Sequence, residues 1–532
     1  MRNATSPSRT MPREAFRASR ALVVVVSTTW LAGCVVGPDY QRPNVAVPAH
    51  WGSAKETKAA KPPELAAWWK RLRDPTLDGL MAEAVAANLD VATAKAKIRE
   101  ARASYRQSVG TLFPTVEGSA SATRSDNGSN VSSGGDVVVA GPFNQFEAGF
   151  DASWELDLFG ANQRGVEAAA YGVQAAEEEL RSTLLTLVGD VASNYVDARG
   201  YQARIALAQR TAASQRETAA LTRNKLEAGA SSAVDVANAA GQAASTEANI
   251  PELQASYAQT VHRLSVLIGQ APSALAERMK KVKPVPTPRL PIPTGVPADI
   301  LASRPDVRLA ERQLAQATAD IGVAEAARYP SVSLTGSIST SGTEIGDLAK
   351  NSSISWSFGP TLTVPIFQGG QLVAAVDVAK AQRDQSFIAY RSSVLTALED
   401  VENAAVSLSK ERIRNGRLAA SAASYREAAR LSRMLYQSGS SSFLDVLDAE
   451  RSAYSADDAL IESRVAITQD YISLNKALGG GWSGTIEVSK PEIVDVNTGP
   501  HFPATKPTCL PQRAAACQTT TPAEVPDAAV AR

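Results

Sequence analysis

Residues 146–158 alternate between apolar and polar side chains along their whole length. The even positions, from Phe146 to Leu158, are apolar, and the odd positions are charged, small or polar. A period of two predicts a β-strand, and this one is longer than the usual strand of about 5–6 residues. A strand of about 9–11 residues crosses a bilayer at a tilt. The pattern favours a strand between lipid and water, although a half-buried strand of a soluble antiparallel sheet would alternate in the same way.

Three further segments alternate with the same period, starting at Val116, Val332 and Ile354. In the last of these the apolar face is expected to extend to Ile366. The residues that connect paired segments are rich in Gly, Ser and Asn, which is typical of exposed loops. We therefore expect four strands, two in each of these ranges: residues 114–158 and 330–366.

A helical pattern begins after Gly160 and continues to about Ala228. Apolar residues recur in it every seven positions, as in a coiled coil, and a helix of this length would reach roughly 100 Å. Residues 229–232 supply a turn, and residues 233–268 are expected to return as a second helix, kinked at Pro251. The heptad positions are Val173, Leu180 and Leu187, and Leu184, Val191, Ala198 and Ile205.

The chain contains the same arrangement twice. Residues 229–269 align without gaps with residues 439–479. A self-similarity of this length indicates an internal duplication, in which each half has a helix, two strands, a very long helix, a turn and a long helix. The first repeat is placed at residues 88–270 with its tip at 229–238, and the second at residues 304–480 with its tip at 439–448.

The first residues have the form of an export signal. Arginines precede an apolar run that starts at Ala21 and ends in Leu31-Ala-Gly-Cys34. The run is shorter than the about 20 apolar residues of a membrane-spanning helix, and it fits a secretory signal over residues 1–33. Its end resembles a bacterial lipoprotein cleavage box, which implies lipidation of Cys34, while an ordinary signal peptide with a chance cysteine is the alternative. Met1 and Met11 are both candidate starts.

The remaining segments are less regular. Residues 34–87 are interpreted as a lipid-anchored N-terminal segment, and residues 271–303 as a Pro-rich linker with little structure of its own. Residues 481–532 are polar and Pro-bearing, which predicts a disordered tail.

Composition narrows the functional class. Lys plus Arg and Asp plus Glu both number 54, so no strong field favours nucleic acid. The three cysteines and three histidines lack zinc-like spacing, and no nucleophile–base set or phosphate loop is present. We therefore expect no enzyme, no metal site and no cofactor besides a covalent lipid on Cys34. Whether Cys509 and Cys517 pair stays open.

Four strands cannot close a barrel alone. In hydrocarbon the two edges of such a sheet would leave backbone groups unsatisfied, and known spanning barrels have about eight strands or more. Several chains must therefore pool strands, with two as the minimum and three giving a wider bore. The fold class is mixed α and β, with a transmembrane β-barrel shared between protomers, four strands per chain, and an internal two-fold repeat.

Six motifs are specific in combination: Cys34–Pro43 (CVVGPDYQRP), Trp154–Gly160 (WELDLFG), Arg304–Arg308 (RPDVR), Tyr329–Leu334 (YPSVSL), Val364–Gly370 (VPIFQGG) and Leu444–Arg451 (LDVLDAER). Over about residues 34–480 they resemble outer-membrane efflux factors, most of all the lipoprotein branch that includes the NodT proteins. The resemblance implies a lipid-anchored homotrimer whose twelve-stranded barrel in the outer membrane continues into a long periplasmic α-helical barrel. It also implies docking to a periplasmic adaptor and an inner-membrane pump of the resistance-nodulation-division type.

In that family the helix–turn–helix tips close the periplasmic mouth. Asp445 and Asp448 lie one turn apart on one face of a helix, and symmetry would make them an acidic, cation-selective ring. The resemblance implies that they are gating aspartates, that Asp235 is the acidic residue of the other tip, and that Tyr436 latches the closed state. Helix N-capping is an alternative role for the aspartates, and it does not exclude gating.

One position departs from the family pattern. Some members have an arginine two residues after the tip glycine, where this chain has Ser441. We expect Phe443 and Leu444 to hold the closed state instead, by packing in the bore. Three carboxylates are expected to line the barrel lumen or its lower rim: Asp151, Glu155 and Asp157.

The predicted function is an efflux duct that passively conducts small toxic compounds or drugs from a pump–adaptor complex to the exterior. Two alternatives stay open, namely an outer-membrane channel for type I protein secretion and a structural periplasmic lipoprotein without a pore. Five Met and three His form no metal-relay cluster, which weighs against copper or silver export. The cargo is otherwise not encoded in the sequence.

Overall fold

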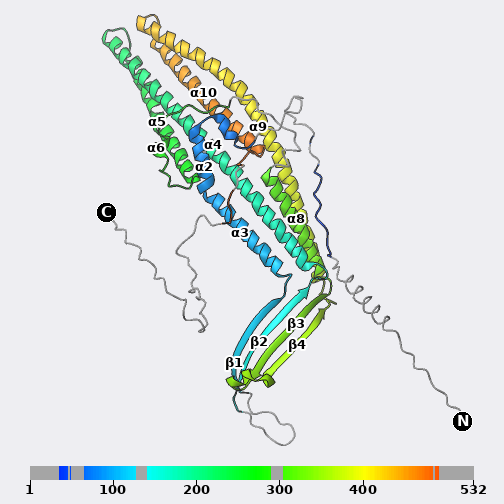
Figure 1. Ribbon diagram of the computed structural model, residues 1–532. Helices are drawn as coiled ribbons and strands as arrows, with labels where there is room; N and C mark the ends of the chain where they lie inside the picture. Colours follow the sequence, from blue (N-terminus) through cyan, green and yellow to red (C-terminus); the bar gives the residue numbers. More distant parts are fainter. Residues whose placement is uncertain are drawn as a thin grey trace, which may run out of the picture. The chain divides into compact units, whose positions relative to one another are not determined.

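The computed structural model describes residues 35–45, 48, 65–126, 141–288, 304–482 and 486–489. In this part of the chain one order of elements occurs twice (Figure 1). The first series is α3 (Leu89–Gly110), β1 (Thr115–Ser125), β2 (Phe143–Leu156), α4 (Ala161–Glu227) and α5 (Ala233–Leu267). The second is α8 (Pro305–Ala326), β3 (Ser331–Gly342), β4 (Ile354–Thr363), α9 (Gln371–Ser438) and α10 (Phe443–Ala477).

Short elements flank these two series. The 3-10 helix η1 (Trp68–Leu72) and α2 (Pro75–Ala87) precede the first, and α6 (Ala276–Met279) follows it. Two 3-10 turns, η2 (Ile345–Ala349) and η3 (Asn351–Ser353), connect β3 to β4. The predicted signal peptide, Cys34, Cys509 and Cys517 lie outside the described residues, together with the loop at 127–140, residues 289–303 of the predicted linker and most of the predicted tail.

The strands form one antiparallel sheet in the order β1-β2-β3-β4. Its register aligns the alternating positions, so that Gly118, Phe150, Ile338 and Trp356 form one row across all four strands. One face is therefore apolar and the other carries hydroxyls and carboxylates. The apolar side chains are not packed into an interior, since Trp356 is 76% exposed.

The long helices pack along their heptad positions. Helix α4 lies against α3, α5, α8 and α10, and Leu184, Val191 and Ala198 of the heptad series are buried. Helix α5 runs through Pro251 as a single element, as the prediction of one helix over residues 233–268 required. Within the described residues, no helix combines the length and hydropathy needed to cross a bilayer.

The main core contains aromatic residues from both ends of the described chain. Trp68 packs edge-on to Tyr471 with ring centroids 5.8 Å apart, and Trp69 stacks on Trp482 at 6.2 Å. The indole of Trp68 donates to the Gly480 carbonyl at 3.1 Å. The prediction of a disordered tail from residue 481 was therefore wrong at its start, because Trp482 closes the core.

Two further boundaries differ from the prediction. Strand β4 ends at Thr363 and not at Ile366, because Thr363 pairs with Ser331, the first residue of β3, and no residue of β3 remains to pair beyond it. The predicted linker contains the helix α6, whose Met279 is fully buried. Burial of Met279 explains why this segment is ordered despite the prolines that follow it.

Candidate functional site

Both helix–turn–helix tips are built by the same local chemistry. Helix α4 ends before Gly229, which has a positive φ of 73°, and α9 ends before Gly439, with a φ of 81°. At the first tip the Ser232 N–H donates to Asp235 at 3.0 Å, and the Asp235 N–H donates to the Ser232 hydroxyl at 3.1 Å. Ser442 and Asp445 form the same reciprocal capping box at the second tip.

The capping role predicted as an alternative for Asp235 and Asp445 is thus present in the structure. Hydrogen bonds from the backbone and hydroxyl of Ser232 lower the pKa of the Asp235 carboxyl below its usual value. Asp448 lies one turn beyond Asp445 on α10, and both are exposed. Exposed carboxylates at the end of a helical hairpin are available to a pore or a partner, so capping and gating remain compatible.

The second tip encloses an aromatic cluster. Tyr436 of α9 is 4% exposed, and its ring packs edge-on against Phe443 of α10 with centroids 5.9 Å apart. Val446, Leu447 and Ala239 complete this buried cluster. Because Ala239 belongs to α5, the cluster joins the tip of the first hairpin to that of the second.

The expectation that Phe443 packs in a bore does not fit this placement. The side chain of Phe443 is 5% exposed and is enclosed by residues of its own chain. Leu444 is 59% exposed and remains available. Ser441, at the position of the missing arginine, donates its hydroxyl to the Ser432 carbonyl at 3.4 Å.

Lys225 provides a cationic contact to this cluster. Its ammonium group donates to the backbone carbonyl of Tyr436 and lies 4.2 Å from the centroid of the Tyr436 ring. The Tyr436 hydroxyl in turn donates to Thr222 at 3.1 Å. Two residues of α4 therefore hold one residue of α9, across the two halves of the chain.

The network continues along the hairpins away from the tip. Thr218 of α4 donates to the buried Glu450 of α10 at 3.1 Å, and Arg433 of α9 donates to the same carboxylate. Arg451 of α10 donates to Gln242 of α5 at 2.5 Å. Sequence reasoning missed these contacts, although Thr218, Thr222 and Lys225 recur at helical spacing on one face of α4.

The carboxylates predicted to line the lumen divide into two groups. Asp151 and Glu155 are exposed on the polar face of the sheet, where Asp151 is paired in register with Glu117. Asp157 lies beyond the end of β2 and accepts the backbone N–H of Gln163 at 2.8 Å. It therefore caps the start of α4, while Glu117, which sequence reasoning overlooked, faces Asp151.

The segment that follows Cys34 is fixed to the fold. The buried Arg164 donates to the carbonyls of Val36 and Gly37, both at 3.1 Å, and to the Asp39 carboxylate at 2.7 Å. Tyr40 donates to Glu311 of α8 at 3.2 Å. Burial and the Glu311 carboxylate raise the pKa of the Tyr40 hydroxyl well above its usual value, so that it stays a donor.

No group of three or more metal-ligating side chains occurs among the residues that the structure describes. The arrangement offers contacts that restrain two hairpins and a sheet with one apolar face. These are the parts of a membrane conduit, which defines the class of protein.

Comparison with known proteins identifies the family. The model of the outer membrane efflux protein family matches residues 80–270 and 296–480, so the chain belongs to this family. It is similar to nodulation protein T of Rhizobium leguminosarum bv. trifolii, with 37% identity over 462 residues, 85% of this chain and 96% of the relative. It is also similar to the solvent efflux pump outer membrane protein SrpC of Pseudomonas putida, with 33% identity over 465 residues, 85% of this chain and 96% of the relative.

Solved structures agree with this assignment. The outer-membrane channel OprN superimposes with a TM-score of 0.78 at 33% identity, covering 84% of this chain and 100% of that one. The open state of the Neisseria gonorrhoeae MtrE outer membrane channel gives 0.72 at 30% identity, covering 84% and 98%. The protein is an outer-membrane efflux channel of the NodT-like type.

Proposed function

We propose that three copies of this chain form one passive duct, with the sheets in the outer membrane and the helices in the periplasm. The observation that carries the proposal is the exposed apolar face of a sheet that ends at β1 on one side and β4 on the other. Hydrocarbon cannot satisfy such edges. Pairing β4 of one copy with β1 of the next satisfies both, and three copies give a closed barrel of twelve strands.

An exposed apolar stripe along α9 supports contact between copies. Ile388, Leu395, Val406 and Ile413 are between 44% and 65% exposed. They are separated by about two or three helical turns each, so they share one face of the helix. A stripe of this kind on a long helix is typical of a coiled-coil interface. In a trimer it would lie against a neighbouring copy and close the helical wall.

The tips are proposed as the closed periplasmic gate. Repeated three times, Asp445 and Asp448 give an acidic ring, and Leu444 is the apolar side chain left to fill the bore. Tyr436, held by Lys225 and Thr222, keeps the second hairpin against the first. In this proposal, Lys225 supplies a restraint on the closed state in a chain that has Ser441 where some members of the family have an arginine.

The proposal includes a covalent lipid on Cys34, a periplasmic adaptor and an inner-membrane resistance-nodulation-division pump. The relatives are named for nodulation, cation efflux and solvent efflux. We assign small toxic compounds as the cargo class, since selection among them belongs to the pump and not to the duct.

Mass and conductance test the duct. Full-length protein purified in detergent is expected to give a particle of three chains by light scattering, and to conduct ions in planar bilayers. A monomer without conductance would overturn the proposal and favour a structural lipoprotein.

Replacement of the predicted lipidation site tests the anchor separately. Cys34→Ala is expected to leave the trimer intact but to lower the fraction that reaches the outer membrane, as measured by membrane fractionation. Absence of lipid labelling on the wild-type protein would contradict the anchor and leave the duct untouched.

A further inference from the structure

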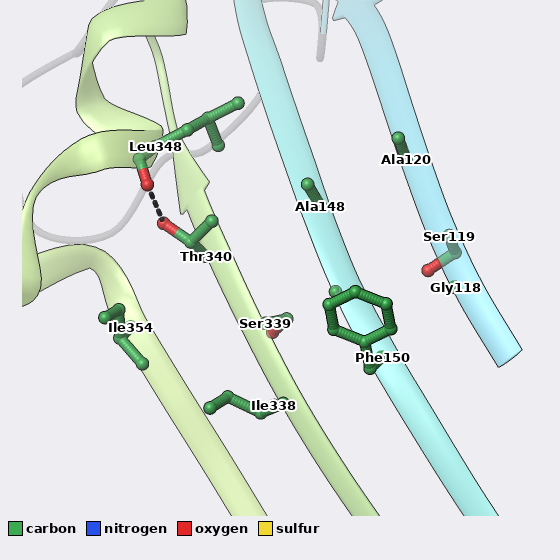
Figure 2. Close-up of a pocket in the computed structure, with 11 residues that line it drawn as sticks. Gly118, Ser119, Ala120, Ala148, Phe150, Ile338, Ser339, Thr340, Leu348 and Ile354 are labelled. Atoms are coloured by element: carbon green, nitrogen blue, oxygen red, sulfur yellow. Dashed lines mark hydrogen bonds between the residues drawn. The ribbon is translucent and has the colours of Figure 1, made fainter. Parts of the chain in front are cut away.

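A groove of about 510 Å³ lies on the apolar face of the sheet, close to η2 (Figure 2). Three residues with small side chains form the bottom of the groove, and three larger apolar side chains form its sides. Such a hollow departs from the rest of this face, where residues such as Trp356 and Phe358 project outward. The floor is formed by Gly118, Ala120 and Ala148, and the sides by Phe150, Ile338 and Leu348.

Two of the hydroxyls that border the groove, those of Thr340 and Ser339, are already satisfied, and Ser119 is an odd position of β1 and so belongs to the opposite face. Thr340 lies on the apolar face, and its hydroxyl donates to the Leu348 carbonyl at 3.0 Å (Figure 2). Ser339 belongs to the opposite face, where its hydroxyl pairs with that of Ser355 at 3.0 Å. Neither hydroxyl needs a hydrogen-bond partner from inside the groove. Hydrocarbon can therefore fill the groove without leaving either hydroxyl unsatisfied.

An arginine lies on the same face toward the loop end of β1. Arg124 is four residues beyond Ala120, so the strand's period of two places both on the apolar face. At about 3.4 Å per residue the two Cα atoms lie roughly 14 Å apart. Arg124 is exposed, and a guanidinium at the rim of a lipid-facing surface is suited to a phosphate of the headgroup region. Lys350 is also near this end, but it is paired with Asp347 at 2.6 Å.

We propose that this groove binds one acyl chain of an anionic, phosphate-bearing lipid of the outer leaflet, with Arg124 on a phosphate. The inference rests on the proposed function, because the face meets lipid only when the sheet lies in the bilayer. The helices leave the sheet at the opposite end from η2 and η3, which connect β3 to β4 (Figure 1). The loop end is therefore the outer-leaflet end. The groove is complete within one chain, so each copy of a trimer would hold one lipid.

Native mass spectrometry of the full-length protein can count the bound lipids. The probes are purified lipopolysaccharide without O-chains and, for comparison, zwitterionic phosphatidylethanolamine. The wild-type protein is expected to hold one lipopolysaccharide per chain and to prefer it over phosphatidylethanolamine. Ala148→Leu, which fills the floor, is expected to weaken lipopolysaccharide binding at least tenfold. Ala152→Leu is the matched control, because Ala152 shares the strand and the face but does not line the groove, and it should stay within twofold.

Arg124→Gln separates the headgroup contact from the acyl groove. It is expected to remove the preference for lipopolysaccharide while phosphatidylethanolamine binding is retained. Equal weakening by Ala148→Leu and Ala152→Leu would overturn the groove, and equal affinity of the wild type for both lipids would overturn the anionic assignment. Conductance in planar bilayers distinguishes these failures from failure of the duct, since a duct without this lipid site would still conduct.

Discussion

The two hairpin tips have the same turn and capping geometry but differ in the side chains that they bury. Gly229, Ser232 and Asp235 of the first tip correspond to Gly439, Ser442 and Asp445 of the second, and each set builds the same turn and capping box. The neighbouring positions differ, since Ala233 of the first tip corresponds to Phe443 of the second. The turn between two helices thus needs only a few polar residues and a glycine. The apolar residues beside the turn decide which tip is packed against the neighbouring helices.

The difference gives the two tips unequal restraints. Phe443 and Leu447 are buried with Tyr436 in a cluster to which the first hairpin contributes the small Ala239, with the partly buried Ala219 and Leu221 packed against it. The first hairpin also supplies Thr222 and Lys225, which bind Tyr436 through polar contacts. The second tip is therefore held mainly by its own buried aromatic residues, and the link between the tips combines apolar contacts at the edge of the cluster with hydrogen bonds.

Removing the ring of Phe443 should have the largest effect. Phe443→Ala deletes the edge-on contact with Tyr436 and leaves a cavity, so the local stability of the second tip should fall by about 3–5 kcal/mol. Hydrogen exchange of the amides of residues 443–448 measures this change. Leu444→Ala is the matched control, because Leu444 is 59% exposed and should change exchange little. Equal effects of the two variants would contradict the buried placement of Phe443.

Removing the charge of Lys225 comes next. Lys225→Met deletes a charged hydrogen bond and a cation–π contact with Tyr436, worth about 2–4 kcal/mol together. The channel is expected to open at least tenfold more often in single-channel recordings, because the two hairpins lose this link. Arg223→Met removes an exposed cation two residues away and should leave gating unchanged. A closed channel in Lys225→Met would show that packing alone holds the gate.

The aspartates of the second tip test the acidic ring. Asp445→Ala combined with Asp448→Ala is expected to raise conductance and to weaken block by divalent cations. Loss of the Asp445 side of the capping box, whose N-cap residue is Ser442, costs about 1 kcal/mol, which corresponds to an about fivefold change in opening. Asp235→Ala removes the equivalent cap from the first tip and serves as the comparison. Unchanged currents in the double variant would exclude both residues from the gate.

Acidification should give the smallest effect, and it should act on the first tip. Hydrogen bonds from Ser232 lower the pKa of the folded Asp235 below its unfolded value. Its contribution is therefore present above the unfolded pKa and is lost as the pH falls through the folded pKa. Exchange of the amides of residues 233–238, normalised to the intrinsic rate at each pH, should rise in acid. Asp235→Asn should remove this pH dependence, and its persistence would contradict the assignment.

Sequence reasoning reached the strands and long helices because their periodicity is local. The alternation of residues 146–158 predicted β2 within a few residues, and the heptads predicted α4. It failed where distant segments decide the structure. Trp68 and Trp69 were not recognised as core residues, since their partners Tyr471 and Trp482 lie at the other end of the chain.

At the candidate site, too, the features set by local sequence could be predicted and those set by distant residues could not. The capping role of Asp235 and Asp445 could be predicted from Ser-x-x-Asp spacing alone. Burial of Phe443 could not, because it depends on Tyr436 and Ala239 from two other helices. Lys225 was overlooked for the same reason, since an isolated lysine near a helix end has no distinctive pattern until its acceptor is known.

The attachment of the segment after Cys34 has a consequence for membrane depth. The Val36 N–H donates to the Phe159 carbonyl at 3.1 Å, three residues after the end of β2, the strand proposed to face lipid. Two residues of extended chain span at most about 7 Å. The lipid on an acylated Cys34 would therefore enter the inner leaflet at the level of the end of the sheet that adjoins the helices. The two residues between Cys34 and Val36 would then limit the depth at which each protomer lies in the bilayer.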